Sequence, residues 1–425
     1  MSKWKKYAAI VALGFAGGTI YLLPYIRYTF YDAQIAAQGI TNTQSSLMLT
    51  VYTIVNMIMY IPGGILADKF KPKKAIAISL VATGLLSFLY AMSLHSFAMS
   101  LIIWAGLSFS TAFVFWSALM KAVGLVGDED QQGFLYGLYY AFNGLSAAIG
   151  GAIALAAYNS AGDDLVAAFS RAVNTEGVIV IVVAIAVWFF LDESKMEVKV
   201  TREEDKFSFK HAVVLLKNPI LWIFSFVVLV GYGFYSNVSY FTPYLTEIQG
   251  IPESSAAAFA LIRTYVFLLL APVGGLIADK LCHSTTKWLT IAYLIIALTF
   301  IGVMALPSTT SPTAASIYTL LPGAVAMMAY GVVFSTLSET GISPAMRGTA
   351  IGLASIIGYL PDTVYSMIFG HWLDNMEAAA AYRTIFIFLA ASGVIGAILT
   401  MYINRKNKQR LEAEAAMADP DAMVE

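Results

Sequence analysis

The chain has 425 residues, of which 59% are hydrophobic and 12% are charged. Soluble domains carry roughly 25% charged residues, so the composition excludes an ordinary soluble globular protein. The net charge of −1 says nothing about partners, because it averages two membrane sides of opposite character.

Apolar runs of about 17–25 residues recur along the chain, and each can cross a hydrocarbon core of roughly 30 Å. Such runs must be helical, since lipid offers no partners for backbone polar groups. The first run follows Lys3, Lys5 and Lys6, as in a signal peptide, but it is too long and has no cleavage site before a soluble domain. We therefore predict about twelve transmembrane helices, at 7–30, 46–67, 75–95, 97–121, 133–158, 174–192, 219–246, 255–277, 287–306, 316–338, 348–372 and 382–403.

One phrase occurs twice, as Pro62-Gly63-Gly64-Ile65-Leu66-Ala67-Asp68-Lys69 and as Val273-Gly274-Gly275-Leu276-Ile277-Ala278-Asp279-Lys280. Asp68 and Asp279 are 211 positions apart, close to half the chain, which indicates a duplicated membrane unit. We expect the paired glycines to let two helix backbones approach closely. The Asp-Lys pair is expected at the membrane edge.

Lys and Arg are concentrated in alternate loops, with Arg171 and Arg383 as the exceptions, so both termini are predicted to be cytoplasmic. The polar stretch 193–217 separates six spans from six and is typical of a solvated linker. The lone Cys282 excludes an internal disulfide framework. The predicted organisation is an N-terminal six-helix bundle (1–192), the cytoplasmic linker (193–217), a C-terminal six-helix bundle (218–405) and a cytoplasmic tail (406–425).

The twelve spans, the central charged loop and the repeated Gly-Gly-x-x-Ala-Asp-Lys phrase resemble the major facilitator superfamily of secondary transporters. The resemblance implies an all-α membrane protein in which two pseudo-symmetric six-helix bundles rock around a central cavity. Two departures stand beside the phrase: Lys71-Pro72 lies where a Gly is common, and the second copy continues Leu281-Cys282-His283. Both leave the Asp in place, so the resemblance implies gating roles for the charged residues Asp68, Lys69, Asp279, Lys280 and Arg347.

A narrower similarity is to the organophosphate/phosphate antiporter branch and its sugar-acid and organic-anion relatives. The segment Tyr21-Leu22-Leu23-Pro24-Tyr25-Ile26-Arg27-Tyr28-Thr29-Phe30 is similar to the first helix of that branch, which implies substrate binding by Arg27. Gly358-Tyr359-Leu360 and the later Phe369-Gly370-His371-Trp372-Leu373-Asp374 look like its eleventh helix.

Departures from that branch leave the substrate open. The seventh span has no Arg near Tyr235, where the branch carries its second Arg, and Phe142 stands at its His position. Arg263 in the eighth span resembles the buried Arg of nitrate/nitrite porters, but Tyr52 stands where their second-span Arg is expected. The chain mixes two patterns, and its substrate cannot be copied from either.

Arginines inside the spans are the first candidates for the site. Arg263 lies about 13–14 Å deep in its span at 1.5 Å per residue, where Arg costs at least about 2.5–3.5 kcal/mol unless it faces a cavity or a partner. Its planar guanidinium suits carboxylate, sulfonate or phosphate groups. We predict substrate contact, with a structural ion pair to Asp362 or another buried acid as the alternative. Arg27 lies nearer the outer end of its span, within reach of the membrane surface.

Asp362 follows Pro361 near the middle of the eleventh span, where a carboxylate can exchange a proton between two access states. It is our candidate for proton coupling, and a purely structural partner of Arg263 is the alternative. Pro361 and Gly358 predict a local break in the helix that lines the cavity. Glu339 ends the tenth span and is a second candidate for proton coupling, although a gate or interface charge explains it better.

Tyrosines and asparagines complete the candidate site. Tyr25 shares one face of the first helix with its neighbours at helical spacing, and Tyr235 lies in the seventh span. We predict that both line the cavity, where an aromatic ring with a hydroxyl suits an organic substrate, and interface anchoring is the alternative. The resemblance places the fifth and seventh helices at the cavity, which implies substrate binding by Asn143 and Asn237; bonding to a neighbouring helix is the alternative.

The sequence has no Gly-x-x-x-x-Gly-Lys-Ser/Thr loop, no Gly-x-Ser-x-Gly turn and no cluster with metal-ligand spacing. We therefore expect no enzyme activity, no cofactor, no metal and no nucleic-acid partner. The prediction is a monomeric secondary transporter of a bacterial inner (plasma) membrane that moves a small organic anion by alternating access, in symport with protons. The alternatives are an anion exchanger driven by counter-substrate and a transporter-like sensor that binds without transport.

Overall fold

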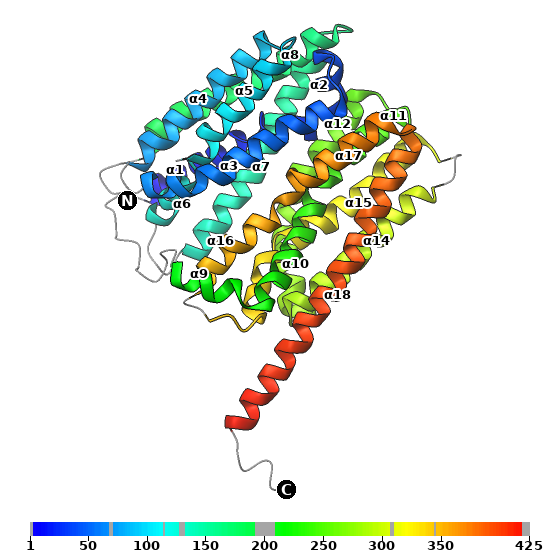
Figure 1. Cartoon of the computed structure of the whole chain (residues 1–425). Coiled ribbons are helices and arrows are strands. Elements are labelled where there is room, and N and C mark those ends of the chain that lie inside the picture. The colour runs from blue at the N-terminus through cyan, green and yellow to red at the C-terminus, as the bar shows by residue number, and fades with distance from the viewer. Residues whose placement is uncertain are drawn as a thin grey trace.

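The computed structural model describes residues 3–67, 71–113, 115–126, 132–191, 209–306, 310–343 and 346–418. Within these ranges the chain forms helices and turns and no strand (Figure 1). The predicted all-α fold class is confirmed. The predicted gating residues Asp68 and Lys69 lie outside the described residues, and so does the side chain of Arg347.

The first half of the chain supplies the helices up to α8 (Figure 1). They are α1 (Lys3–Thr19), the short η1 (Ile26–Tyr28), α2 (Tyr31–Gln38), α3 (Asn42–Ala67), α4 (Pro72–Met92), α5 (Phe97–Ser108), the π-helical η2 (Phe109–Phe113), α6 (Phe115–Val126), α7 (Gln132–Asn159) and α8 (Leu165–Phe190). The first predicted span is not one continuous helix, because α1 ends at Thr19 and turns lead to η1. Pro24 lies in these turns and has no N–H to continue the helical ladder.

Within the described residues, the spans of the second half contain more interruptions than those of the first. Its elements are α9 (Phe209–Leu216), α10 (Pro219–Asn237), η6 (Val238–Tyr240), α11 (Phe241–Glu247), α12 (Glu253–Leu261), the π-helical η7 (Ile262–Val266), η8 (Phe267–Leu270), α13 (Ala271–Leu276), the π-helical η9 (Ile277–Leu281), α14 (Thr285–Met304), α15 (Pro312–Tyr330), η10 (Val333–Glu339), α16 (Arg347–Gly358), η12 (Leu360–Asp362), α17 (Val364–Asn375) and α18 (Ala378–Ala418).

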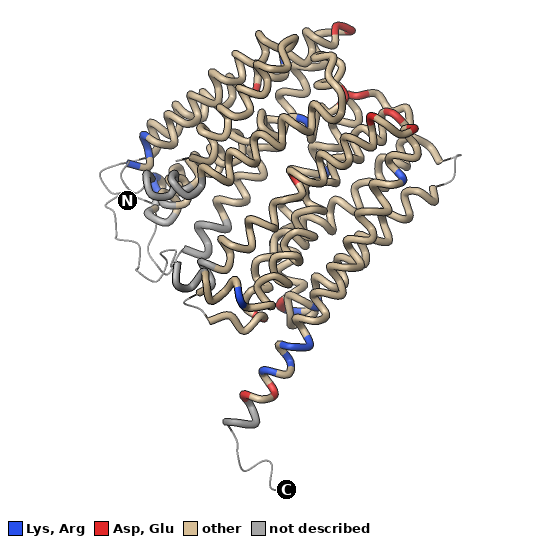
Figure 2. The backbone as a smooth tube through the Cα atoms, viewed as in Figure 1, with Lys and Arg blue, Asp and Glu red and all other residues tan. Residues whose placement is uncertain are grey.

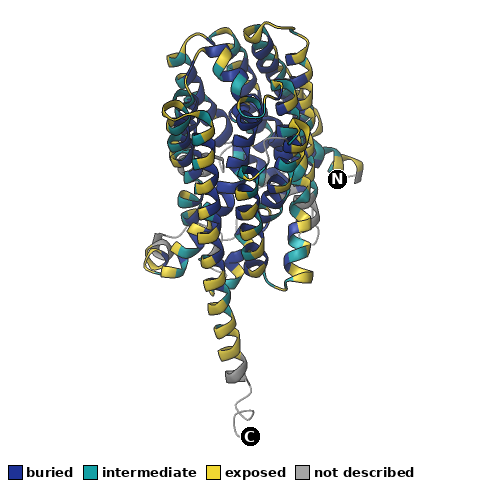
Figure 3. Cartoon of the chain, turned by 90° about the vertical axis from the view of Figure 1, so that its right-hand side faces the viewer, coloured by how far each residue is buried: buried dark blue, intermediate teal, exposed yellow. Residues whose placement is uncertain are grey.

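Ten helical segments of the described structure are long and apolar enough to cross a membrane, and they match the third to twelfth predicted spans. The first two predicted spans correspond to α1 with η1 and to α3. Exposed residues line the flanks of the bundle and buried residues fill its interior (Figure 3). Large apolar side chains are among the exposed ones, for example Ile78, Leu85 and Leu298. Such a surface fits lipid and not water.

The sixth span starts earlier than its apolar run indicates. α8 begins at Leu165, whereas the prediction started at 174. The Asp164 side chain caps this start by accepting a hydrogen bond from the Ala167 N–H at 3.0 Å. Polar residues in the first turns of α8 lower its local hydropathy, which explains the error. Glu176 consequently lies not near the helix start but about 17 Å along the helix.

Buried apolar side chains cluster mainly within each half, with Tyr31 in the second-half cluster and Leu261 in a first-half cluster. In the second half, α10, α14 and α18 pack together around Phe234, Tyr293 and Phe386. In the first half, α1 and α4 pack against α7 and α8, and buried side chains form two clusters. The helices thus form two bundles, as the duplication predicts. The residue boundaries predicted for the bundles stay predictions.

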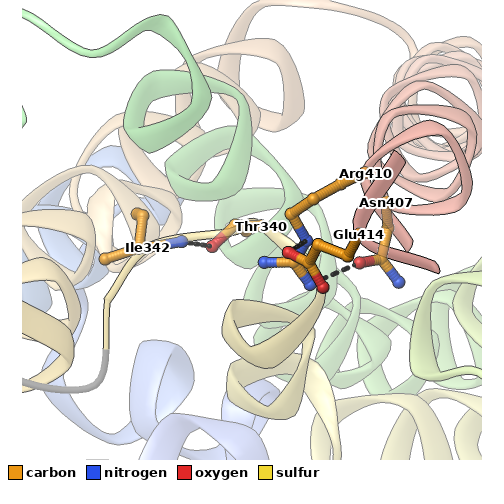
Figure 4. Close-up of polar contacts among 5 residues, drawn as sticks. All are labelled: Thr340, Ile342, Asn407, Arg410 and Glu414. Atoms are coloured by element: carbon orange, nitrogen blue, oxygen red, sulfur yellow. Dashed lines mark hydrogen bonds and ion pairs between the residues drawn. The ribbon is translucent and has the colours of Figure 1, made fainter. Parts of the chain in front are cut away.

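The two ends of the bundle differ in charge. Both chain termini lie at one end, which we name the terminal face, and described Lys and Arg residues gather there, while a group of described Asp and Glu residues marks the other end, the opposite face (Figures 1 and 2). The C-terminal part of α18 projects from the terminal face (Figure 1). Arg410 on this projection donates to Asn407 Oδ1 at 2.7 Å and pairs with Glu414 at 3.7 Å, next to the turn at Gly341 (Figure 4).

The second copy of the repeated phrase packs as its glycines predict. A Cβ atom on Gly274 would lie 2.0 Å from the Met328 carbonyl oxygen, so α13 and α15 touch backbone to backbone. We expect Gly274→Ala to lower the thermal midpoint of the purified protein, because a backbone atom cannot move aside and overpacking costs about 1–3 kcal/mol.

Gly275→Ala is the matched control, since the nearest atom to its Cβ would be 3.9 Å away. Thermal unfolding of both variants in detergent checks the prediction. Equal midpoints for the two variants would contradict the close helix contact.

Candidate functional site

A break in the eleventh span positions Asp362 inside the bundle. α16 ends at Gly358, η12 runs from Leu360 to Asp362, and α17 starts at Val364, as Gly358 and Pro361 predicted. A Cβ on Gly358 would lie 2.5 Å from Val228 Cγ1, so the helix end packs tightly on α10. Asp362 is 2% exposed.

Three tyrosine hydroxyls donate hydrogen bonds to the Asp362 carboxylate. Tyr25 and Tyr28 of the first half donate at 3.3 and 3.1 Å, and Tyr232 of α10 donates at 2.6 Å. We name Asp362 with these three tyrosines the Asp362 cluster. Because its members come from both halves, the carboxylate links the halves directly. Hydrogen bonds to a charged group are worth about 1.5–3 kcal/mol each.

Arg27 lies beside this cluster with neutral partners. Its Nη1 donates to Ser46 Oγ at 3.2 Å and its Nη2 to Tyr240 Oη at 3.4 Å. The guanidinium also lies 4.9 Å from the centre of the Tyr31 ring. Arg27 is 4% exposed, so its side chain does not reach the surface. No acidic residue within the described ranges forms an ion pair with it.

Arg263 is wholly buried in the second half. It lies on the π-helical η7, and its Nη1 and Nη2 donate to Thr319 Oγ1 at 3.0 Å and Thr242 Oγ1 at 2.9 Å. Its Nε has no hydrogen-bond partner. The side chain lies against Gly323, where a Cβ would come within 2.3 Å of Arg263 Cγ. The alternative ion pair with Asp362 is not formed in this part of the structure.

Thr242 connects Arg263 to the Asp362 cluster. Its hydroxyl accepts from Arg263 and lies 3.4 Å from the Tyr28 carbonyl oxygen, to which it donates. The structure therefore brings Arg27, Arg263 and Asp362 into one connected polar region between the halves. The substrate-binding and proton-coupling roles predicted for them stay predictions.

Of the remaining candidates, Tyr235 lies closest to this region. Its ring stacks on Tyr330 at 4.2 Å and lies 5.5 Å from the ring of Tyr232, which bonds Asp362. Asn237 donates to the Gly233 carbonyl oxygen of its own helix at 2.8 Å. Asn143 donates to Tyr139 Oη at 3.2 Å within α7. In the described contacts the amides of Asn143 and Asn237 form hydrogen bonds within their own helices, so their substrate contacts stay predictions.

The other predicted residues lie at the terminal face. Glu339 accepts hydrogen bonds from the Ser284 hydroxyl at 2.9 Å and the Thr285 N–H at 2.5 Å, so it caps the start of α14. This arrangement agrees with an interface charge, and the proton-coupling role of Glu339 stays a prediction. Asp279 and Lys280 are exposed on η9, which agrees with their predicted place at the membrane edge.

One buried acid was missed by sequence reasoning. Glu176 on α8 is 3% exposed, and its Oε2 has no hydrogen-bond partner. Its position inside a predicted span was a signal, but the late predicted start of that span placed it at the membrane edge.

The halves also meet at the opposite face. Asp374 of α17 accepts hydrogen bonds from the backbone N–H groups of Asn42 at 2.9 Å and Thr43 at 2.7 Å, and it thereby caps α3 of the other half. A Cβ on Gly370 would lie 2.6 Å from Ser46 Oγ and 2.9 Å from the Asn42 carbonyl oxygen. We name this contact of α3 with α17 the outer seal.

Two further contacts between the halves lie near the outer seal. Thr246 donates to Asp32 Oδ2 at 2.5 Å, and Tyr158 donates to Glu253 Oε2 at 2.6 Å. Each pair joins one residue of the first half to one of the second. The opposite face is therefore closed in this conformation.

Gly370→Val is expected to open the outer seal, because a branched side chain has no room against the α3 backbone. The measurement is a spin-label distance across the opposite face, between Asp163→Cys and Glu377→Cys on exposed positions, with Cys282→Ser removing the native thiol. We expect a longer distance population. Gly352→Val is the control, since nothing lies within 4 Å of its Cβ. An unchanged distance in Gly370→Val would contradict the role of the contact.

Comparison with known proteins agrees with this architecture. The model of the Major Facilitator Superfamily matches residues 7–364. Inner membrane protein YihN of Escherichia coli (strain K12) is 28% identical over 419 residues, covering 97% of this chain and 99% of the relative. The probable sulfoacetate transporter SauU of Cupriavidus necator is 21% identical over 398 residues, covering 86% of each protein.

A solved structure has the same fold. A bacterial homologue of the human lysosomal transporter Spinster, in an inward-facing and unoccupied conformation, matches with a TM-score of 0.69 at 18% identity, over 96% of this chain and 98% of that chain. Since the family model covers most of the chain and the repeated phrase lies within it, the chain belongs to the Major Facilitator Superfamily.

Proposed function

We propose that this chain is a secondary transporter that carries a small organic anion across a bacterial inner membrane, by alternating access and in symport with protons. Both termini lie in the cytoplasm in this proposal, so the opposite face is external. The observation that carries it is a pair of buried arginines with neutral partners, Arg27 and Arg263, beside a carboxylate held by tyrosines of both halves.

The arginines support an anionic substrate. Two buried arginines share this region with one buried carboxylate, so at least one positive charge lacks an opposite charge. Burying such a cation costs several kcal/mol, and hydroxyl partners repay only part of this cost. The free Nε of Arg263 lacks an acceptor. A carboxylate, sulfonate or phosphate group supplies both the charge and the acceptor. The similarity to SauU, a probable sulfoacetate transporter, agrees with this substrate class.

The Asp362 cluster supports proton coupling. In the externally closed conformation three donated hydrogen bonds stabilise the ionised carboxylate. Opening the external face moves the first half away, so Asp362 loses Tyr25 and Tyr28 and binds a proton more readily. Closure restores both bonds and favours release of the proton. Asp362 thus binds a proton while the external side is open and releases it while that side is closed, so each cycle carries a proton inward.

The outer seal supports alternating access. It closes the external face through Asp374 and Gly370, which join α17 to α3. The repeated charged phrase lies at the terminal face, where Asp279 and Lys280 are exposed. We propose that these residues, together with Asp68, Lys69 and Arg347, close the cytoplasmic side in the alternate conformation.

Two measurements test the proposed function. Purified protein is first screened for thermal stabilisation by carboxylates, sugar acids, sulfonates and sugar phosphates. The best ligand is then labelled and offered to proteoliposomes with an inward proton gradient. We expect accumulation that collapses with a protonophore. Accumulation that needs only internal counter-substrate would indicate an exchanger, and binding without accumulation would indicate a sensor; either result overturns symport.

A further inference from the structure

Glu176 is a buried acid that the proposed transport site does not use. It lies in the middle of α8 with 3% of its surface exposed, on the helix that also carries the buried residues Ala172 and Val173. Its Oε2 has no hydrogen-bond partner. An ionised carboxylate in such a place costs several kcal/mol, so this conformation holds Glu176 as the neutral acid.

The surroundings of Glu176 contrast with those of Asp362. Asp362 accepts three hydrogen bonds from tyrosines, whereas nothing in the described contacts donates to Glu176. Two buried carboxyl groups in opposite environments take opposite protonation states in the same conformation. Separation of the halves therefore favours protonation of Asp362 and ionisation of Glu176.

One residue of the second half covers the region around Glu176. Tyr265 lies on η7 and packs against the hydrophobic cluster of the first half that contains Ala172 and Val173. Its side chain also forms a hydrogen bond with Thr29 of the first half. Leu261, one turn before it, lies 2.3 Å from the place of a Cβ on Gly151 of α7. The side chains that keep water from Glu176 on this side thus belong to the second half, and they move away when the halves separate.

Few groups act on Glu176 electrostatically. The described groups that interact with its charge are the uncharged hydroxyls of Tyr90 on α4 and Tyr265 on η7. The remaining elements packed on α8 are α1, α2 and α7, and no charged side chain among their described residues acts on it. Solvent access is therefore the main variable that decides its protonation.

We propose that closure of the external face requires a proton on Glu176, which makes it a second proton-binding carboxyl that couples external acidity to the closed conformation. This inference rests on the proposed function for the identity of the external face. Separation of the halves withdraws η7, lets water reach the acid and allows it to ionise. Closure of the ionised form would trap an unpaired charge, so the open conformation persists until a proton binds.

The test measures conformation and needs no substrate. The spin-label pair Asp163→Cys and Glu377→Cys reports the external face between pH 5 and 9. In otherwise unmodified protein, the ratio of closed to open molecules falls by up to about tenfold per pH unit once Glu176 can ionise in the open form. Glu176→Gln, which keeps the size and stays neutral, is expected to remain closed at high pH.

Controls separate protonation from packing. Glu176→Asp keeps a titratable group and should retain a pH-dependent closure, which a purely structural role does not predict. Asp32, Glu253 and Asp374 at the external contacts, and Asp362 between the halves, remain in every variant, so the difference between variants belongs to position 176. The pH dependence of the thermal midpoint gives a second readout, and Glu176→Gln should flatten it.

The outcomes distinguish this inference from the proposed function. A Glu176→Gln protein whose closure follows pH as the parent does would overturn the role of Glu176, even if uptake is proton-driven. A pH-dependent closure that Glu176→Gln abolishes would support it, even if no anion accumulates. Opening of Glu176→Gln at every pH would also contradict it, because the neutral side chain should favour closure.

Discussion

Asp362→Asn is expected to abolish accumulation of the substrate against its gradient while leaving exchange within about twofold of the parent. The amide oxygen can accept from Tyr25 and Tyr232, as Oδ2 does now, and the amide nitrogen can donate to the Tyr28 hydroxyl, so the site keeps its shape, but no proton can bind. A gradient of one pH unit supplies about 1.4 kcal/mol per proton, which allows roughly tenfold accumulation in the parent. In the variant the internal concentration should only equal the external one.

Tyr232→Phe is the companion variant. It removes the shortest hydrogen bond to Asp362, at 2.6 Å, and leaves the carboxyl group in place. Since the tyrosine hydroxyl stabilises the ionised carboxylate, its loss makes protonation easier, and the pH of half-maximal uptake should rise. Uptake and counterflow in proteoliposomes across pH measure both variants. Proton-driven accumulation by Asp362→Asn would remove Asp362 from the coupling step.

The sequence could predict the charged centre of the site because charges in lipid-spanning helices are rare. Arg27, Arg263 and Asp362 stand out against apolar neighbours, and each is buried in the structure. Pro361 with Gly358 predicted the break that turns Asp362 inward, since both residues act on the local backbone. These features depend on short stretches of chain, which is why they can be read without the fold.

The partners of these charges could not be predicted in the same way. The sequence left two predicted partners for the Arg263 guanidinium, a substrate and Asp362. In the structure the guanidinium donates instead to the hydroxyls of Thr242 and Thr319. Tyr232 reaches Asp362 across 130 positions of sequence. Such contacts depend on how helices dock, and helical periodicity carries no information about docking.

Hydropathy reasoning failed where polar residues begin a helix. α8 starts before its apolar run, and the Asp164 cap was the available signal for the true start. With that cap recognised, Glu176 would have appeared as a deep carboxyl group. The first span failed for a related reason, because the break after Thr19 is set by Pro24 inside an otherwise apolar run.

Arg263→Lys is expected to abolish most of the thermal stabilisation that the best anionic ligand gives. Lysine keeps the positive charge, but its single ammonium group cannot reproduce the planar fork or the Nε–H that now lacks a partner. Loss of a charge-assisted, two-point contact costs about 2–3 kcal/mol, which corresponds to an affinity roughly 30- to 150-fold weaker. Titration of the ligand against the thermal midpoint measures this change.

Two further variants are compared with Arg263→Lys. Arg383→Lys makes the same exchange at an exposed position and should leave the affinity unchanged. Gly323→Ala keeps the guanidinium but places a Cβ 2.3 Å from Arg263 Cγ, so the side chain must shift and affinity should fall although no charge changes. If Arg263→Lys and Gly323→Ala both bind the anion as the parent does, Arg263 is a structural residue of the second half, and Arg27 alone has to account for anion recognition.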